Sequence, residues 1–106
     1  MTKESFRRLA LALPGAEEKS HFGKADFRVR DKIFASLKDD RTGVIKLTPE
    51  EQSVMVDAEP RIFQPIPGGW GRKGWTKIEL AAADEVTLKS ALLMAWRNVV
   101  PKTLKT

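Results

Sequence analysis

The segment with the clearest chemical potential combines cations, glycines and indoles: Trp70-Gly71-Arg72-Lys73-Gly74-Trp75, followed by Lys77. Arg72 and Lys73 can neutralise phosphates, glycines allow a backbone to approach a ligand closely, and an exposed indole can stack on a nucleobase. Because tryptophan is usually buried, the alternative is that both indoles cover the sheet or fill the core and the cations are merely solvated.

A second basic row precedes it in the chain, formed by Arg28, Arg30 and Lys32. Contacts from such a row to phosphate and sugar would be independent of sequence, because only base edges carry sequence information. A charged strand face that is simply solvated is the alternative. The basic residues near the C-terminus that would extend this footprint are Arg97, Lys102 and Lys105.

The charge distribution agrees with a polyanionic partner. The chain has a net charge of +5 and a pI of about 9.7. Residues 24–46 carry 7 basic and 4 acidic groups, residues 61–80 carry 4 and 1, and residues 47–60 between them carry 0 and 4. Positive charge is therefore concentrated in separate segments, although +5 is also an ordinary solubility charge for a small domain.

Catalytic and metal-binding chemistry is poorly represented. The chain has no cysteine, no tyrosine and a single histidine, His21, so thiolate zinc sites and common nucleophile–base pairs are excluded. An enzyme would have to assemble its site from His21 and nearby carboxylates, and would show a concave pocket with a perturbed histidine pKa. We expect a structural histidine, no catalysis, no cofactor and no metal.

Length and hydropathy predict one domain over residues 1–106, since 106 residues suffice for one hydrophobic core and not for two. No apolar run approaches the roughly 18 residues of a membrane span, and the N-terminus is too polar for a signal peptide. We therefore expect a cytoplasmic protein without a membrane partner, and we favour a monomer.

The spacing of apolar residues predicts the helices and strands around these segments. A first amphipathic helix is predicted from Thr2 or Ser5 to Leu13, ended by Pro14-Gly15. In the extended run Ile33–Leu37, the side chains of Ile33, Ala35 and Leu37 should share a face. The extended runs predict an antiparallel meander, with Gly23-Lys24-Ala25-Asp26 between the first two: Lys19–Phe22, Phe27–Arg30, Ile33–Leu37 and Val44–Leu47.

The second half begins with a capping-box signal at Thr48-Pro49-Glu50-Glu51, which predicts a helix to about Asp57. The remaining predicted elements are an edge strand over Arg61–Ile66, a flexible basic loop over Gly68–Gly74, a strand over Trp75–Leu80, and a long helix from Asp84 that ends before Pro101. The predicted class is α+β with a mainly antiparallel sheet.

An ordered set of short motifs spans nearly the whole chain: Leu13-Pro14-Gly15-Ala16-Glu17-Glu18, His21-Phe22-Gly23-Lys24, Phe27-Arg28-Val29, Lys32-Ile33-Phe34-Ala35, Gly74-Trp75, Trp96-Arg97 and Pro101-Lys102. This set resembles the YjbR/MmcQ-like family. The resemblance implies a frataxin-like (CyaY-like) α/β sandwich, with terminal helices on one side of an antiparallel sheet, and a "double wing" arrangement for binding DNA. Iron binding does not follow, because Glu4 stands against Lys3, Arg7 and Arg8 in the first helix.

Two functional hypotheses follow. The first is a DNA-binding module of low sequence specificity, which contacts phosphates through Arg28, Arg30 and Lys32 and through Trp70, Arg72, Lys73, Trp75 and Lys77. The second is a protein-interaction or small-ligand module that uses the aromatic sheet face. The second predicts an apolar groove and binding insensitive to salt.

Overall fold

The computed structural model describes residues 1–21 and 23–101, apart from the side chain of His21. The strands in chain order are β1 Glu17–His21, β2 Lys24–Val29, β3 Lys32–Leu37, β4 Thr42–Lys46, β5 Phe63–Pro65 and β6 Trp75–Glu79. The helices are α1 Lys3–Leu11, α2 Pro49–Ala58, α3 Gly69–Arg72 and α4 Glu85–Arg97, with a 3-10 turn at Leu80–Ala82.

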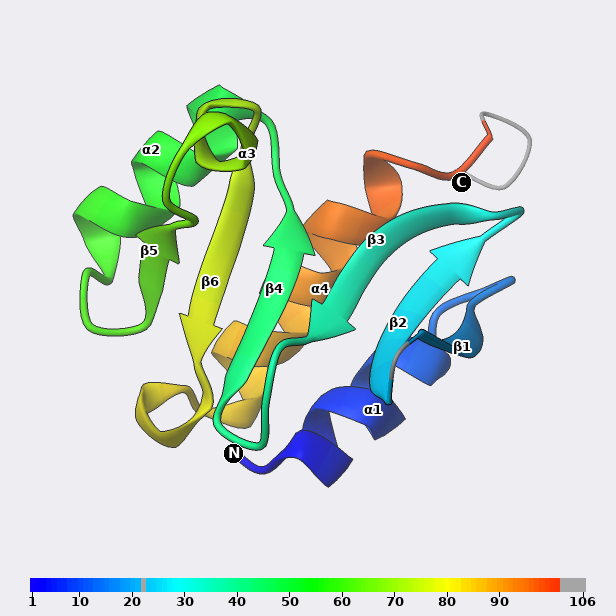
Figure 1. Ribbon diagram of the computed structural model, residues 1–106. Coiled ribbons are helices and arrows are strands. Elements are labelled where there is room, and N and C mark those ends of the chain that lie inside the picture. The colour runs from blue at the N-terminus through cyan, green and yellow to red at the C-terminus, as the bar shows by residue number, and fades with distance from the viewer. Residues whose placement is uncertain (22, 102–106) are drawn as a thin grey trace.

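These strands form an antiparallel sheet in the order β1-β2-β3-β4-β6-β5 (Figure 1). The first four strands follow one another as a meander, as predicted. The chain runs through α2 and β5 before β6, and β6 pairs with β4. β5 pairs with β6 alone, so it is a short edge strand. Prolines are tolerated at such an edge, so Pro65 fits its end.

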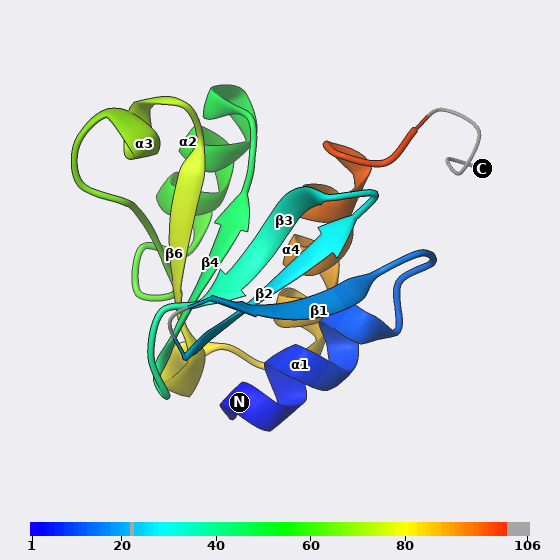
Figure 2. The same cartoon turned by 45° about the vertical axis from the view of Figure 1, so that its right-hand side comes forward.

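The two terminal helices pack together on one side of this sheet and cover its core face. In Figure 1 α4 lies behind the strands, and Figure 2 shows α1 below β1 and β2. Phe27, Ile45 and Ile78 are fully buried beneath them, and the Phe6 ring lies 5.8 Å from the Phe27 ring between centroids. The predicted α+β class, with N- and C-terminal helices on one side of an antiparallel sheet, is confirmed.

Local signals in the sequence account for where the helices begin. The Thr48 hydroxyl accepts a hydrogen bond from the Glu51 amide at 3.1 Å, and the Glu51 carboxylate accepts one from the Thr48 amide at 2.9 Å, which completes the capping box. Asp84 caps α4 by accepting from the Thr87 amide at 2.7 Å. None of the helices in the described part of the chain is long and apolar enough to cross a membrane.

Two predictions about strands were wrong. β2 begins at Lys24, so Lys24-Ala25-Asp26 belongs to a strand; the acidic Asp26 is accommodated there because Arg28, on the same face, neutralises it. Ile33 and Ala35 do not share a face, because the β2–β3 register shifts after Phe27, which pairs with Ala35, whereas Arg28 pairs with Ile33. Phe34 is the extra residue of this bulge.

The predicted flexible loop over Gly68–Gly74 was also wrong, because residues 69–72 form the short helix α3. Its geometry depends on close backbone contact. A Cβ added to Gly71 would lie 1.8 Å from the Ile66 carbonyl oxygen, and one added to Gly74 would lie 1.9 Å from that of Leu47. These glycines therefore let the chain approach its own backbone, which fixes α3 against the sheet.

Candidate functional site

The face of the sheet opposite α1 and α4 carries the functional candidates, and we call it the open face. Strand alternation places residues there in register across four strands: Asp26 pairs with Ser36, Ser36 with Val44, and Val44 with Lys77. Their neighbours along the strands point into the core, as the alternating burial of β6 shows. The predicted division of β6, with Trp75 and Lys77 opposite Thr76 and Ile78, is confirmed.

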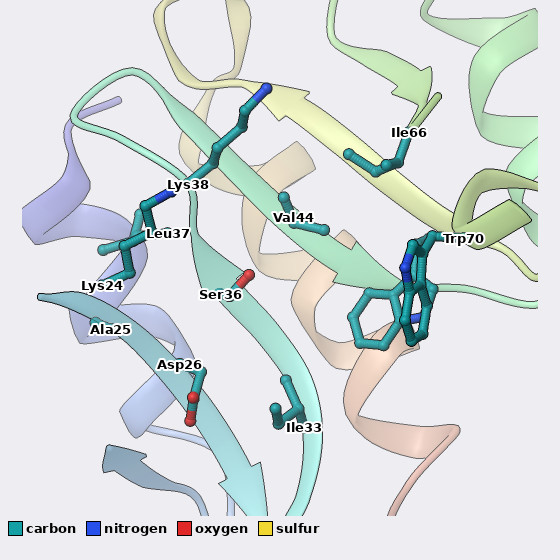
Figure 3. A pocket seen from close by; sticks show the side chains of 11 residues that line it. Lys24, Ala25, Asp26, Ile33, Ser36, Leu37, Lys38, Val44, Ile66 and Trp70 are labelled. Atoms are coloured by element: carbon teal, nitrogen blue, oxygen red, sulfur yellow. The ribbon is translucent and has the colours of Figure 1, made fainter. Parts of the chain in front are cut away.

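A groove of about 410 Å³ crosses this open face (Figure 3). Its lining is mainly apolar, with Ile33, Val44 and Ile66 along its course and Trp70 and Trp75 at one end. Lys24 and Lys38 stand at the opposite end. The groove thus combines apolar walls with cations, and its volume lies within the roughly 300–1,000 Å³ of small-molecule sites.

The tryptophans at the groove differ from the third one, Trp96. Trp96 is 5% exposed, and its indole N–H donates to the Pro14 carbonyl oxygen at 2.8 Å, so it is a core residue. Trp70 is 63% exposed, and its ring meets that of the half-buried Trp75 edge-on, at 6.2 Å between centroids and 77° between planes. Trp70 is therefore available to a ligand.

A lysine ammonium lies over each of these two indole rings. The Lys73 ammonium lies 5.3 Å from the centre of the Trp70 ring, and the Lys46 ammonium lies 4.9 Å from that of Trp75. Cation–π attraction is worth about 0.5–1 kcal/mol at exposed sites. It biases both cations towards the aromatic end of the groove without neutralising their charge.

Gln52 of α2 holds the aromatic end in place. Its side-chain amide donates to the carbonyl oxygens of Gly71 and Trp75, both at 3.0 Å, and to the Thr76 hydroxyl at 3.1 Å. That hydroxyl donates in turn to the Gly74 carbonyl oxygen at 2.8 Å. One amide therefore joins the end of α3 to the start of β6, and so fixes the relative position of the two indoles.

The β2–β3 connection forms the other basic segment. Val29 pairs with Lys32, and the two turn residues between them, Arg30 and Asp31, have positive φ values of 50° and 69°. Two-residue hairpins of type I′ require this conformation, which favours Asn-Gly and strains arginine. The Lys19 ammonium donates to the Asp31 carboxylate at 2.9 Å, and this hydrogen bond lowers the pKa of Asp31 below its usual value.

Topology brings the two predicted basic segments to the same end of the sheet. β4 ends at Lys46, which pairs with Trp75, and antiparallel β3 begins beside that end at Lys32. The β2–β3 turn and α3 consequently lie at one end, on either side of the open face (Figure 1). Within these two segments, the predicted residues that are exposed are Arg30, Lys32, Trp70, Arg72 and Lys73. Lys32 pairs with the buried Val29, so it lies at the sheet end but on the covered side.

Not every predicted residue is equally free. Arg28 is half-buried, and its guanidinium donates to both carboxylate oxygens of Asp26, at 2.7 and 3.0 Å. Arg97 is exposed in the last turn of α4, a helix of the opposite side. The Lys102 and Lys105 predictions, and the side chain of His21, lie outside the described part of the structure.

The cations of α1 differ from the lysines of the open face. In α1 each of the three cations has a carboxylate partner: Lys3 contacts Asp40, Arg7 contacts Glu18, and Arg8 contacts Glu85. Within residues 1–21 and 23–101, the lysines of the open face with no carboxylate oxygen within 4.0 Å are Lys24, Lys38, Lys46 and Lys77. Their charge remains available to an external anion.

Sequence reasoning missed several of these residues. Lys24 was assigned to a connection, while Lys38 and Lys46 lie at strand ends where alternation with Ser36 and Val44 would have placed them on the open face. Gln52 gave no signal beyond being polar within a helix. In the described side chains, no group of three or more histidines, aspartates or glutamates is arranged to hold a metal ion.

Comparisons with known proteins show which family the chain belongs to. The YjbR family model matches residues 11–98. A crystal structure of the Deinococcus radiodurans protein DR2400, with the domain DUF419, is similar to this fold at a TM-score of 0.78 and 20% identity, covering 96% of this chain and 80% of that one. No curated protein matches the chain. Because the family match covers most of its length, the chain belongs to the YjbR family.

Proposed function

We propose that this protein binds nucleic acid with low sequence specificity and without catalysis, by holding phosphates on the cations of its open face and of the adjoining end of the sheet. The observation that carries the proposal is the position of the two basic segments. Arg30 and Lys32 on one side, and Arg72 and Lys73 on the other, are exposed at the same end of the sheet, with Trp70 beside them.

The free lysines of the open face support this proposal. Lys46 lies beside Trp75 at the end of β4, and Lys77 lies on β6 opposite Val44; neither has a carboxylate partner among the described residues. A cation without an internal carboxylate partner can contact a phosphate without a competing internal anion. Arg28 is expected to contribute less, because Asp26 already accepts two hydrogen bonds from one edge of its guanidinium.

Low specificity follows from the type of contact. Lysine carries a compact point charge on a flexible stem, and contacts to phosphate oxygens fix a position without reading bases. The acidic α2, with Glu50 and Asp57 exposed, packs beside β5 at one edge of the sheet. Its repulsion of phosphates would keep the bound polymer on the strands between β1 and β6.

The groove favours a second candidate function, the binding of a small ligand or a protein segment. Its walls at Ile33, Val44 and Ile66 are apolar, and apolar burial would drive such binding. The two functions differ in their response to salt, because phosphate contacts release counterions and apolar contacts do not.

The test is fluorescence anisotropy with labelled DNA over a series of NaCl concentrations. Four to six neutralised phosphates predict a log–log slope of roughly −3 to −5. Single charge reversals Arg72→Glu, Arg30→Glu and Lys77→Glu should each weaken binding and flatten this slope by about 1 or more. Lys89→Glu is the matched control, because Lys89 is exposed on α4, which packs on the covered side.

Two results would contradict the proposal. One is the absence of binding at low salt. The other is equal loss of affinity in Lys89→Glu and Arg72→Glu, since the effect would then follow net charge and not the open face. Salt-insensitive binding of an apolar ligand in the groove would support the second candidate function instead.

A further inference from the structure

We infer that the open face binds a single strand, with at least one unstacked base in the groove against Trp70 and the phosphates on the lysines at its two ends. This inference rests on the nucleic-acid binding proposed above and specifies the form of the ligand. It uses the groove and the aromatic pair, which phosphate contacts alone leave without a role.

The first argument is the apolar character of the groove. A duplex presents phosphates and sugars outward and keeps its bases stacked, so it offers base edges but no base face to Ile33, Val44 and Ile66. A single strand exposes its base faces, which are recognised in proteins by stacking on aromatic side chains. Taking a base out of a duplex costs a few kcal/mol, whereas a single strand largely avoids this cost.

The second argument is the geometry of the indoles. Trp70 and Trp75 meet edge-on, so their ring planes differ by 77° and form a corner at the end of the groove. Trp70 keeps 63% of its surface exposed, although an apolar ring gains by burial. Gln52 holds the backbone of both segments, so the corner is formed before a ligand arrives and little ordering is needed on binding.

The third argument is charge complementarity along the groove, which selects a polyanion over an apolar peptide. Lys24 and Lys38 stand at one end, and Lys46 and Lys73 lie over the indoles at the other. The carboxylate in the lining, Asp26, is neutralised by Arg28 at 2.7 Å. A strand that follows the groove therefore meets cations at both ends and no uncompensated lining carboxylate within the described residues.

The experiment compares four probes of matched length in competition with a labelled oligothymidylate: the unlabelled oligothymidylate, an abasic strand with the same phosphates, a duplex, and polyglutamate. The oligothymidylate should bind at least about five-fold more tightly than the abasic strand for each stacked base. It should also compete better than the duplex and polyglutamate.

Variants locate the effect. Trp70→Ala should remove the difference between the oligothymidylate and the abasic strand while leaving abasic binding unchanged, and Trp70→Phe should retain part of it. Val86→Ala is the control, since Val86 is an apolar side chain that is 79% exposed on α4. Circular dichroism would establish that each variant is folded.

The outcomes separate this inference from the proposed function. If the abasic strand or the duplex binds as tightly as the oligothymidylate, or if Trp70→Ala changes all nucleic acids equally, the inference is overturned and nucleic-acid binding stands. If polyglutamate competes equally well, the face is a general polyanion surface and the inference is overturned. If no nucleic acid binds, both fail.

Discussion

The two faces of the sheet are built from alternate residues of the same strands, and they differ in almost every property. On the covered face Phe27, Ile45 and Ile78 are fully buried beneath α1 and α4. On the open face, Val44 lines the groove and Lys77 pairs with it on the next strand. Each of them follows and precedes a buried residue in its own strand. Stability and binding should therefore respond to different substitutions, even when those substitutions are adjacent in sequence.

Ion pairing differs between α1 and the open face. The cations of α1 on the covered side are each held by a carboxylate, whereas the described lysines of the open face are held by none. Exposed ion pairs contribute little to stability, about 0–1 kcal/mol each. Within the described residues, Lys89 and Arg97 of α4 also have no carboxylate oxygen within 4.0 Å, so the contrast in ion pairing is between α1 and the open face.

The largest expected effect is on the covered face. Phe27→Ala removes a fully buried ring that contacts Phe6 and should lower the free energy of unfolding by about 3–5 kcal/mol, measured by urea denaturation. Val44→Ala on the open face should cost far less, since Val44 is half-buried. Equal costs for the two would mean that the faces do not divide stability in this way.

The next effect concerns the support of the aromatic corner. Gln52→Leu removes the side-chain hydrogen bonds to the Gly71 and Trp75 carbonyls, which keep their backbone donors, and should cost about 1–2 kcal/mol. It should also change tryptophan fluorescence, because Trp70 and Trp75 lose their common anchor. Gln64→Leu, at an exposed position of β5, is the control, and an unchanged emission spectrum in Gln52→Leu would show that Gln52 does not position the indoles.

A substitution of Arg30 should change the free energy of unfolding and the affinity for DNA in opposite directions. Arg30→Asn places a residue that tolerates positive φ in the β2–β3 turn and should raise the free energy of unfolding by about 1 kcal/mol. It also removes an exposed cation, so DNA affinity at low salt should fall. Lys32→Asn should lower affinity without the gain in stability; a gain of equal size there would remove the role of backbone strain.

The smallest effect is a pH dependence at the same turn. Lys19 lowers the pKa of Asp31 from 3.8 in the folded state, so this carboxylate stabilises the fold above that value. Its contribution is lost as pH falls below about 4, because the unfolded chain then binds more protons. Asp31→Asn and Lys19→Met should each flatten the stability curve in this range; an unchanged curve in both would contradict the assignment.

The fold was predictable where local chemistry decides it. The Thr48–Glu51 capping box, the Asp84 cap and the alternation of β6 all appear in the structure as the sequence indicates. Each depends on hydrogen bonds or side-chain directions within a few residues, so no knowledge of the tertiary structure was needed.

The site was less predictable because tertiary contacts form it. α3 contains two glycines in four residues, and its position depends on Gln52 and on the contact of Gly71 with Ile66. The bulge at Phe34 moves Ile33 to the open face, which no alternation pattern could predict. The ion pair of Arg28 with Asp26 requires both residues to lie in β2, which begins at Lys24 and not at Phe27.

The indole N–H signals in a ¹⁵N-correlated NMR titration with a short oligothymidylate test the central claim most directly. The chain has three tryptophans, and they report on both faces. Binding on the open face predicts that the Trp70 and Trp75 signals shift with increasing oligonucleotide, while the signal of Trp96, bonded to Pro14 in the core, stays unchanged. Saturable binding that moves Trp96 and leaves Trp70 and Trp75 in place would contradict the account.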